Sequence, residues 1–331
     1  MIHTHENSAI EVHGIPFFEQ HGKYLRINDE LFEKMPNLSF LGKLVTGARL
    51  RFRTNSQTIK VSFSIAKPHC PSYLADFSAV VFYGKGTDSE YAGHTQVEIT
   101  DEGSITVGKF KKSADMQDVT VFFPKYAMVS GYGVEIEDGA VIEAPTPYKY
   151  NKPILFYGSS ITQGGAASIC SNAYTAMLSR WLDFDYYNMG FSGNAKGEII
   201  MADYLNTIDF AAFVLDYDHN AGYSELRETH EPFFKRIREA HPDVPILMMS
   251  RPNTDEAPEG AADRRDIILN TLNNAKAAGD DKVYFINGET FFGKEHRMEC
   301  TVDKVHPNDL GHYRMATTIE PVLKEILEKY C

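Results

Sequence analysis

The sequence predicts two parts of different class: an all-β sandwich or jelly-roll domain over residues 1–147, and a three-layer α/β/α domain with a parallel sheet over residues 148–331. Three observations support this division. Apolar and polar residues alternate in short segments through the first part, a proline-rich segment follows, and strand-like and helix-like segments then alternate to the end of the chain. With 331 residues and 43% hydrophobic content, the chain is long enough to bury a core in each part.

The alternation in the first part is typical of half-buried strands. Residues 48–53 place apolar side chains on one face and Arg49, Arg51 and Arg53 on the other. The arginine side is predicted to be a solvated strand face, with an anionic-sugar subsite as the alternative. Further strands are expected at 59–65, 79–83, 95–100, 104–107, 118–123 and 133–137. Many short strands without a helical pattern between them favour a sandwich or jelly roll.

The segment 144–153 separates the two parts, because its three prolines favour extended backbone and make it a plausible linker. Beyond it, strands are expected at 154–157, 186–189, 211–215, 245–249 and 283–286, and helices at 174–182, 224–240, 263–278 and after Pro307. Strands that alternate with helices imply a parallel sheet covered on both faces. In such sheets, binding sites form beyond the carboxyl ends of the strands.

Composition narrows the functional class. The formal net charge of -12 argues against a nucleic-acid groove and against attraction to an anionic membrane surface, and no apolar run approaches membrane-spanning length. The cysteines are far apart in the sequence: Cys70, Cys170, Cys300 and Cys331. Since no metal-site spacing and no signal peptide is apparent, we expect no metal or cofactor, and reduced thiols in a cytoplasmic protein. A secreted protein is the alternative if a signal has been removed.

Residues that can carry chemistry follow the predicted strands of the second part. Ser160 lies in the loop after the first strand, Gly193 in the loop after the second, and Asn220 in the loop after the third. Asp303 and His306, three residues apart, precede the last helix. Because the carboxyl ends of parallel strands meet at one edge of a sheet, we expect these loops to lie together.

These are the residue types that acyl transfer requires. A serine hydroxyl becomes nucleophilic when a base removes its proton, and Asp303 can hold the His306 ring so that its other nitrogen faces Ser160. The N–H groups of Ser160 and Gly193 and the side-chain amide of Asn220 are the candidate oxyanion donors. Ser160 is also expected at the start of a helix, whose positive end favours an anion. The sequence therefore predicts a serine triad that needs no metal.

Taken together, four segments resemble those of the SGNH or GDSL-type hydrolases: Gly158-Ser159-Ser160, Asn188 to Gly193, Asn220, and Asp303 to Pro307. The resemblance covers about residues 152–331 and implies an SGNH-hydrolase-like domain of flavodoxin-like fold. By this resemblance four residues give the family its letters: Ser160, Gly193, Asn220 and His306. Asp303 completes the triad. The β-rich first part is similar to that of two-domain members, several of which are carbohydrate esterases that remove acetyl groups from sugars.

Two positions depart from the family pattern. Ser159 stands where an aspartate is usual, which is expected to alter a supporting hydrogen bond, and residues 218–221 read Asp-His-Asn-Ala instead of G-x-N-D. His219 is either a pocket residue that contacts substrate or an ordinary loop histidine. Tyr217 and Phe191 either form a sugar-stacking wall or belong to the core.

Each motif also has an ordinary structural explanation. The segment around Ser160 could be a simple turn before a helix cap, and Gly193 and Asn220 could serve turns. Asp303 and His306 could cap the last helix.

The function favoured by the combination is hydrolysis of a small acyl ester, an O-acetyl group on a carbohydrate above all, through an acyl-Ser160 intermediate. An acyltransferase or thioesterase with the same triad is the first alternative, and an inactive carbohydrate-binding protein is the second. The expected partner is a small-molecule or oligosaccharide ester, with no nucleic acid and no membrane. A homo-oligomer is left open.

Overall fold

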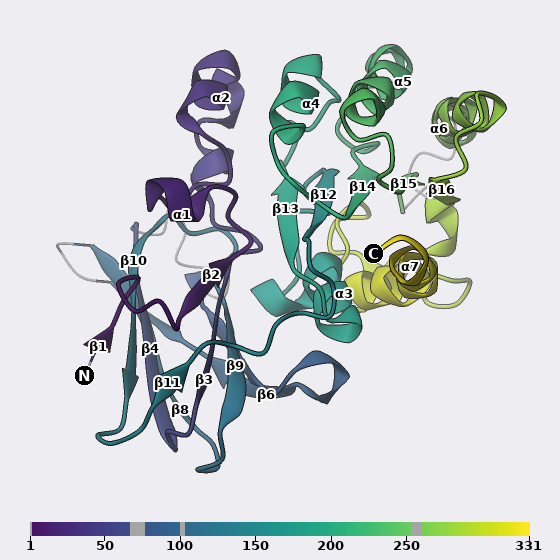
Figure 1. Cartoon of the computed structure of the whole chain (residues 1–331). Helices are drawn as coiled ribbons and strands as arrows, with labels where there is room; N and C mark the ends of the chain where they lie inside the picture. The colour runs from purple at the N-terminus through teal and green to yellow at the C-terminus, as the bar shows by residue number, and fades with distance from the viewer. Residues whose placement is uncertain (1, 67–76, 100–102, 253–259) are drawn as a thin grey trace.

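The structure, a computed structural model, describes residues 2–66, 77–99, 103–252 and 260–331. A β-rich N-terminal part lies beside a part in which strands and helices alternate (Figure 1). The N-terminal part contains antiparallel sheets and the C-terminal part a five-stranded parallel sheet, which confirms the predicted fold class. The exact division at residue 147 stays a prediction.

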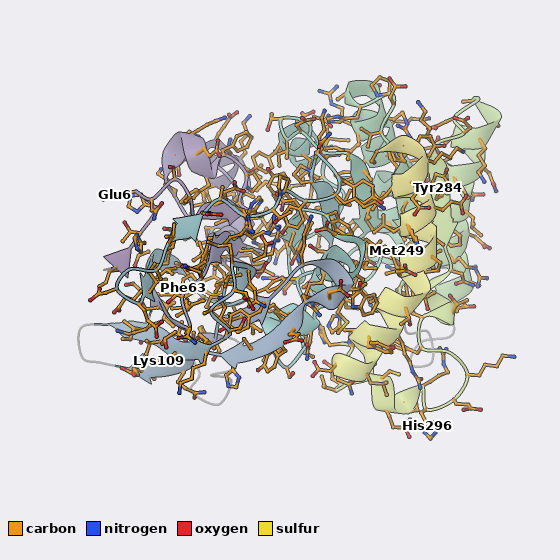
Figure 2. The ribbon with its side chains drawn as sticks, turned by 60° about the horizontal axis from the view of Figure 1, so that its bottom comes forward. Glu6, Phe63, Lys109, Met249, Tyr284 and His296 are labelled. Atoms are coloured by element: carbon orange, nitrogen blue, oxygen red, sulfur yellow. The ribbon has the colours of Figure 1, made fainter. Side chains whose placement is uncertain are left out.

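Two antiparallel sheets form the N-terminal part. One has the strand order β1-β10-β4-β8-β7, and the other has the order β11-β3-β9-β5-β6, with β2 paired to β3. The strands are β1 (Ile2–His3), β2 (Glu11–His13), β3 (Arg49–Thr54), β4 (Thr58–Ile65), β5 (Val80–Tyr83), β6 (Glu90–His94), β7 (Gln96–Ile99), β8 (Ser104–Lys111), β9 (Gln117–Phe122), β10 (Val129–Ile136) and β11 (Ile142–Glu143). In the core between the sheets, the rings of Phe63 and Phe123 have centroids 4.5 Å apart. Figure 2 shows Phe63 among densely packed side chains and Lys109 at the periphery.

Two short helices, α1 (Phe18–His21) and α2 (Asp29–Lys34), lie between β2 and β3 in the chain and were not predicted. Asn28 caps α2 by accepting a hydrogen bond from Leu31 N–H at 2.9 Å. Two predictions fall on residues outside the described ones: the reduced thiol of Cys70, and the last residue of the strand expected at 95–100. The other cysteines form no disulfide within the described part of the chain.

Two of the three arginines on this side of β3 are buried, so the prediction of a solvated face is wrong for Arg49 and Arg51, whereas Arg53 is partly exposed. Arg49 is 0% exposed and Arg51 is 2% exposed. Arg49 forms an ion pair with Asp185 and lies 4.1 Å from the ring centroid of Tyr186, while the Arg51 guanidinium lies 3.8 Å from that of Tyr148. The alternation correctly marked which face is polar, but the C-terminal part and the linker cover that face. Their carboxylate and aromatic rings compensate the burial of two guanidinium groups.

The C-terminal sheet is parallel throughout, in the order β13-β12-β14-β15-β16. Its strands are β12 (Ile154–Gly158), β13 (Tyr186–Gly190), β14 (Ala212–Asp216), β15 (Ile246–Met249) and β16 (Val283–Ile286). The helices are α3 (Tyr174–Leu182), α4 (Ile199–Leu205), α5 (Tyr223–Ala240), α6 (Ala261–Ala277) and α7 (Asp309–Tyr330). Counted from β12, this is the flavodoxin-like order 2-1-3-4-5. None of the described helices combines the length and apolar character needed to cross a bilayer.

Both faces of this sheet are covered. Phe156 of β12 packs in a core with α3 and α7, whereas Leu155 and Tyr157 pack in a second core with α4, α5 and α6. The order of strands changes direction between β12 and β14, and the crevice of a doubly wound sheet opens at such a point. The loops after β12 and β14, which carry Ser160 and Asn220, are therefore placed at this crevice.

Candidate active site

Ser160 lies in a tight loop directly after β12. This strand ends at Gly158, where a Cβ would overlap Thr162, so only glycine allows the loop to pack this closely. Ser159, at the position where the family has aspartate, accepts a hydrogen bond from Ile161 N–H at 3.1 Å through its Oγ. The serine thus still supports the loop, although with a neutral acceptor.

Ser160 does not lie at the start of a helix, contrary to the prediction. The first helix after β12 is α3, which begins at Tyr174. The residues after Ser160 form turns, one of them closed by the Gly165 N–H donating to Ser160 O at 2.7 Å. The consecutive glycines Gly164 and Gly165 in this stretch disfavour a continuous helix. The Ser160 N–H has no acceptor among the described residues, so it is available to an oxyanion without help from a helix dipole.

Two short hydrogen bonds connect the three residues of the predicted triad. Ser160 Oγ lies 2.8 Å from His306 Nε2, and His306 Nδ1 lies 2.7 Å from Asp303 Oδ2. The other carboxylate oxygen of Asp303 accepts from the backbone N–H groups of Val305, at 3.0 Å, and His306, at 2.7 Å. Burial raises the pKa of Asp303, but these hydrogen bonds outweigh it and hold the pKa below its ordinary value. The carboxylate therefore stays charged and favours the His306 tautomer that carries its proton on Nδ1.

Asp303 and His306 do not cap the last helix. The N-cap of α7 is Asn308, whose side chain accepts from Gly311 N–H at 3.1 Å. Pro307 accordingly lies just before the cap and not in the first turn of the helix. The ordinary structural explanation for this motif is excluded.

Two of the three candidate oxyanion donors, Gly193 and Asn220, lie in the loops after β13 and β14. The Gly193 N–H donates to Asn220 Oδ1 at 3.2 Å, and Asn220 Nδ2 donates to Phe191 O at 2.9 Å. An amide nitrogen carries two hydrogens, so one N–H of Asn220 remains for an oxyanion. The Gly193 N–H orients the Asn220 amide in this structure and would have to be shared with an oxyanion. The role of both groups in catalysis stays a prediction.

A cavity of about 850 Å³ opens above the triad. It is lined by Tyr126, Ser160, Gly165, Ala166, Ala167, Ser168, Ser192, Gly193, His219, Asn220, Val302, Asp303, Val305 and His306. The lining includes Tyr126 from the N-terminal part, so both parts of the chain form the wall.

His219 faces this cavity and is not a satisfied loop histidine. Its Nε2 atom is buried and has no hydrogen-bond partner in the described part of the chain. Burial lowers the pKa of His219 to about 4, so the ring is neutral near neutral pH. A neutral imidazole with an unused ring nitrogen can bind a hydroxyl or carbonyl group of a substrate.

The expectation that Tyr217 and Phe191 form a stacking wall is wrong. Tyr217 is 1% exposed, and its hydroxyl group pairs with Thr229 Oγ1 at 2.9 Å. Phe191 is 0% exposed and packs against the guanidinium group of Arg26. Both rings follow β-strands and point into the core under α4 and α5, so neither lines the cavity.

The loop that follows β12 and carries Ser160 (residues 159–167) is called the nucleophile loop. Several residues that hold it in place were not predicted from the sequence. Lys125 Nζ, from the N-terminal part, donates to Gly164 O at 3.0 Å and to Ala167 O. From α7, His312 donates its Nε2–H to Gly165 O at 3.1 Å, because its Nδ1 accepts from a backbone N–H. These contacts join positions far apart in the sequence, and no local motif marks either residue.

A buried ion pair holds the loop that carries His219 and Asn220. Arg264 of α6 lies 2.7 Å from Asp218 Oδ1, and its guanidinium group also donates to Ala221 O at 2.7 Å. Asp218 is therefore a structural anchor. This ion pair supplies the support for Asn220 in a segment that departs from the G-x-N-D pattern.

Comparison with known proteins agrees with this architecture. A family model described as the GDSL-like lipase/acylhydrolase family matches residues 151–324, and a model for the N-terminus of SGNH-hydrolase-type esterases matches residues 2–142. Comparison with curated protein sequences finds no match.

Solved structures similar to this chain have the same two-part architecture. A protein described as GDSL-like lipase from Bacteroides ovatus has a TM-score of 0.86 and 26% identity, covering 99% of this chain and 98% of its own. The salicylyl-acyltransferase SsfX3 from a tetracycline biosynthetic pathway has a TM-score of 0.79 and 20% identity, covering 98% and 97%. An acetyl xylan esterase from the rumen bacterium Butyrivibrio proteoclasticus has a TM-score of 0.65 and 12% identity, covering 100% of both chains.

Proposed function

Because this chain belongs to the GDSL-like lipase/acylhydrolase family, we propose that it is a serine esterase that hydrolyses small acyl esters, O-acetyl groups on carbohydrates above all, through an acyl-Ser160 intermediate. One observation carries the proposal: Ser160 Oγ lies 2.8 Å from His306 Nε2, whose ring is hydrogen-bonded to Asp303 at 2.7 Å. This is the hydrogen-bonded relay that activates a serine hydroxyl.

The reaction proceeds in two halves. His306 Nε2 takes the Ser160 proton as Oγ attacks the acyl carbon, and the carbonyl oxygen becomes an oxyanion facing the Ser160 N–H and the Asn220 amide. His306 then gives the proton to the departing alcohol, which leaves the acyl group on Ser160. In the second half His306 removes a proton from water, whose oxygen attacks the acyl carbon, and returns the proton to Ser160. Asp303 keeps the ring oriented throughout and stabilises its charged form.

Three observations favour an acetylated carbohydrate as the substrate. The acetyl xylan esterase with the same fold is named for an acetylated sugar polymer. The unpaired Nε2 of His219 in the cavity is suited to a sugar hydroxyl group. A cavity of about 850 Å³ also has room for an acyl group together with its sugar.

Transfer of an acyl group to an alcohol other than water is the second candidate. A salicylyl-acyltransferase has the same fold. Ala166, Ala167 and Val305 give part of the cavity an apolar wall that could accept a larger acyl group. Transfer uses the same acyl-Ser160 intermediate. An alcohol takes the place of water as the acceptor in the second half, and with a thioester substrate a thiol takes the place of the departing alcohol in the first half.

Replacement of the nucleophile tests the proposal. Wild type, Ser160→Ala and Asn220→Ala are assayed on an activated acetate ester and on acetylated oligosaccharides, with intact-mass spectrometry to detect acyl-enzyme. Ser160→Ala should abolish turnover and the acyl adduct, and Asn220→Ala should lower kcat about 10²- to 10³-fold, as expected for one oxyanion donor. A competing alcohol in the assay separates hydrolysis from transfer, because only a transferase forms the new ester as its main product. Wild-type turnover by Ser160→Ala would contradict the mechanism.

A further inference from the structure

We infer that Arg26, in the N-terminal part, is a positioning residue for the loop that follows β13 in the C-terminal part (residues 191–194), called the oxyanion loop. The inference rests on the proposed function, because it assigns to Arg26 a role in the reaction at Ser160. It also gives the β-rich part a task in catalysis that no motif in the sequence indicates.

The first step in the argument is the position of β13. This strand is at the edge of the parallel sheet, so the backbone groups along its outer side have no neighbouring strand. Arg26 Nη1 donates to Asn188 O at 2.9 Å and to Gly190 O at 2.7 Å. These two carbonyls are two residues apart and therefore face the same side of β13. The guanidinium group thus supplies the hydrogen-bond donors that a neighbouring strand would otherwise offer to the end of β13.

The second step is the way in which Arg26 is itself held. Its Nε donates to Leu44 O at 2.7 Å and its Nη2 to Leu41 O at 2.7 Å, and the residue is 1% exposed. Within the described residues no ion pair joins Arg26 to a carboxylate, so four backbone carbonyls and the face of the Phe191 ring compensate the buried charge. The rigid, planar fork of arginine suits this arrangement, and the single ammonium group of lysine does not.

The third step connects Arg26 to the reacting groups. Gly190 leads into the oxyanion loop, and the guanidinium carbon lies 4.7 Å from the ring centroid of Phe191. Phe191 O in turn accepts from Asn220 Nδ2 at 2.9 Å, and the Gly193 N–H donates to Asn220 Oδ1 at 3.2 Å. Two of the three candidate oxyanion donors, the Gly193 N–H and the Asn220 amide, are thus oriented from the segment that Arg26 fixes. A displacement of about 1 Å in such a segment can cost about 100-fold in rate.

Arg180 offers a matched control. It is a partly buried arginine between the two parts, where it lies 4.6 Å from the ring centroid of Phe82 and donates to Ser171 O at 2.7 Å. Within the described residues its hydrogen bonds go to Ser171 O and Ala176 O, and none goes to β13 or to the oxyanion loop. Loss of Arg180 should therefore lower the stability of the protein but leave the oxyanion donors in place.

The experiment compares Arg26→Met, Arg26→Lys and Arg180→Met in the full chain. Each variant is characterised by kcat and KM on an activated acetate ester, by urea unfolding, and by inhibition constants for a boronic acid and for acetate. A boronic acid forms a tetrahedral adduct with Ser160 that needs the oxyanion donors, whereas acetate binds as product. Arg26→Met should lower kcat about tenfold or more, leave KM within about threefold, and weaken the boronic acid as much as kcat while acetate is unaffected. Arg26→Lys should recover part of the loss, and Arg180→Met should keep the wild-type kcat.

Two results would overturn the inference: wild-type kcat and boronic-acid affinity in Arg26→Met, or the same loss of kcat in Arg180→Met at equal loss of stability. If Arg26→Met does not fold, kcat and the inhibition constants are measured on Arg26→Lys instead. This variant should still lose more affinity for the boronic acid than for acetate, and equal affinities to wild type would overturn the inference. Failure of the proposed function is recognised separately, because Ser160→Ala would then remain active.

Discussion

Asp216 is a buried carboxyl group beside the candidate site that the proposed reaction does not use. It lies at the end of β14 and accepts hydrogen bonds from Thr162 Oγ1 at 2.8 Å and from the Tyr174 hydroxyl group at 2.9 Å. Burial raises the pKa of Asp216 to about 7, and the nearby charge of Asp218 acts in the same direction, against the two hydrogen bonds. The Asp216 side chain therefore connects Thr162 of the nucleophile loop to Tyr174 of α3. Burial at this position removes the water that would stabilise its charged form.

This position predicts a pH dependence of stability. Between the ordinary pKa of 3.8 and about 7, the folded chain holds a proton on Asp216 that the unfolded chain has released. The free energy of unfolding should then fall as pH rises through this window, by up to about 1.4 kcal/mol per pH unit from this group. Asp216→Asn should remove that contribution while keeping an acceptor oxygen. Urea unfolding of both proteins at about pH 5 and about pH 8 measures it, and an unchanged pH slope in the variant would refute it.

Single residues also show what a motif can and cannot indicate. Ser160, Asp303 and His306 were predicted to meet, and they do, because a loop after a strand and a loop before a helix leave few places for these side chains. For Tyr217 and Phe191 the sequence left a stacking wall and the core as alternatives, and the two rings are buried in the core. A residue one position after a strand can point to the cavity or to the core, and the direction depends on how the loop turns.

At the scale of elements, the close contact between β13 and the nucleophile loop depends on Gly190. A Cβ at this position would overlap the backbone of Gln163 and Thr162. Gly193, in the same loop, has a φ of 69°, but no atom lies within 4 Å of the place that a Cβ would take, so its glycine is needed for backbone conformation alone.

Gly190→Ala should therefore destabilise the protein by about 1–3 kcal/mol, the usual range for overpacking, and should lower kcat because the end of β13 must move away from the loop of Ser160. The measurements are urea unfolding and turnover of an activated acetate ester. Gly131→Ala in β10 is the control, since nothing lies within 4 Å of its Cβ position and its φ is ordinary. Equal stability of the two variants would mean that the contact at Gly190 is not tight.

The elements themselves were predicted to different degrees. Strands β4, β9, β12 and β14 follow apolar patterns that are visible locally, and they appear close to the expected positions. The helices α1 and α2 are too short to show a periodicity, and a helix at Ser160 was expected where the chain forms turns instead. Short elements depend on contacts with other parts of the chain more than on their own sequence.

At the scale of the whole molecule, a charged network joins the two parts. His13 of β2 lies between two carboxylates, with Nδ1 2.8 Å from Asp185 and Nε2 2.9 Å from Glu11. Burial lowers the pKa of His13, but the two carboxylates outweigh it and raise the pKa above its ordinary value, even with Arg49 acting against them. The pKa values of both carboxyl groups are lowered. In Glu11 the hydrogen bond with His13 is the largest cause. In Asp185 burial acts to raise the pKa, but His13 and Arg49 together outweigh it.

His13→Gln should show the sign of this linkage. A raised histidine pKa contributes stability that is complete below the ordinary value of 6.5 and is lost as pH rises through the folded value. The variant should therefore be less stable than wild type by about 1–3 kcal/mol at about pH 6 and much closer to it at about pH 9. Urea unfolding at the two pH values tests this, with His94→Gln on exposed β6 as the control that should change neither. An equal loss at both pH values would show that His13 acts as a neutral hydrogen-bonding group.

Local patterns in the chain were sufficient for the two fold classes, for the strands of the parallel sheet, and for the expectation that Ser160, Asp303 and His306 meet. Hydrophobic periodicity and the residue types of a loop depend on neighbouring residues and can therefore be recognised in the sequence. They could not show that Arg49 and Arg51 are buried, that Arg26 completes β13, or that Lys125 holds the nucleophile loop. Those facts depend on how one part packs against the other. A buried cation and an exposed one look the same in sequence, since the groups that compensate a buried charge are backbone carbonyls and carboxylates far away along the chain.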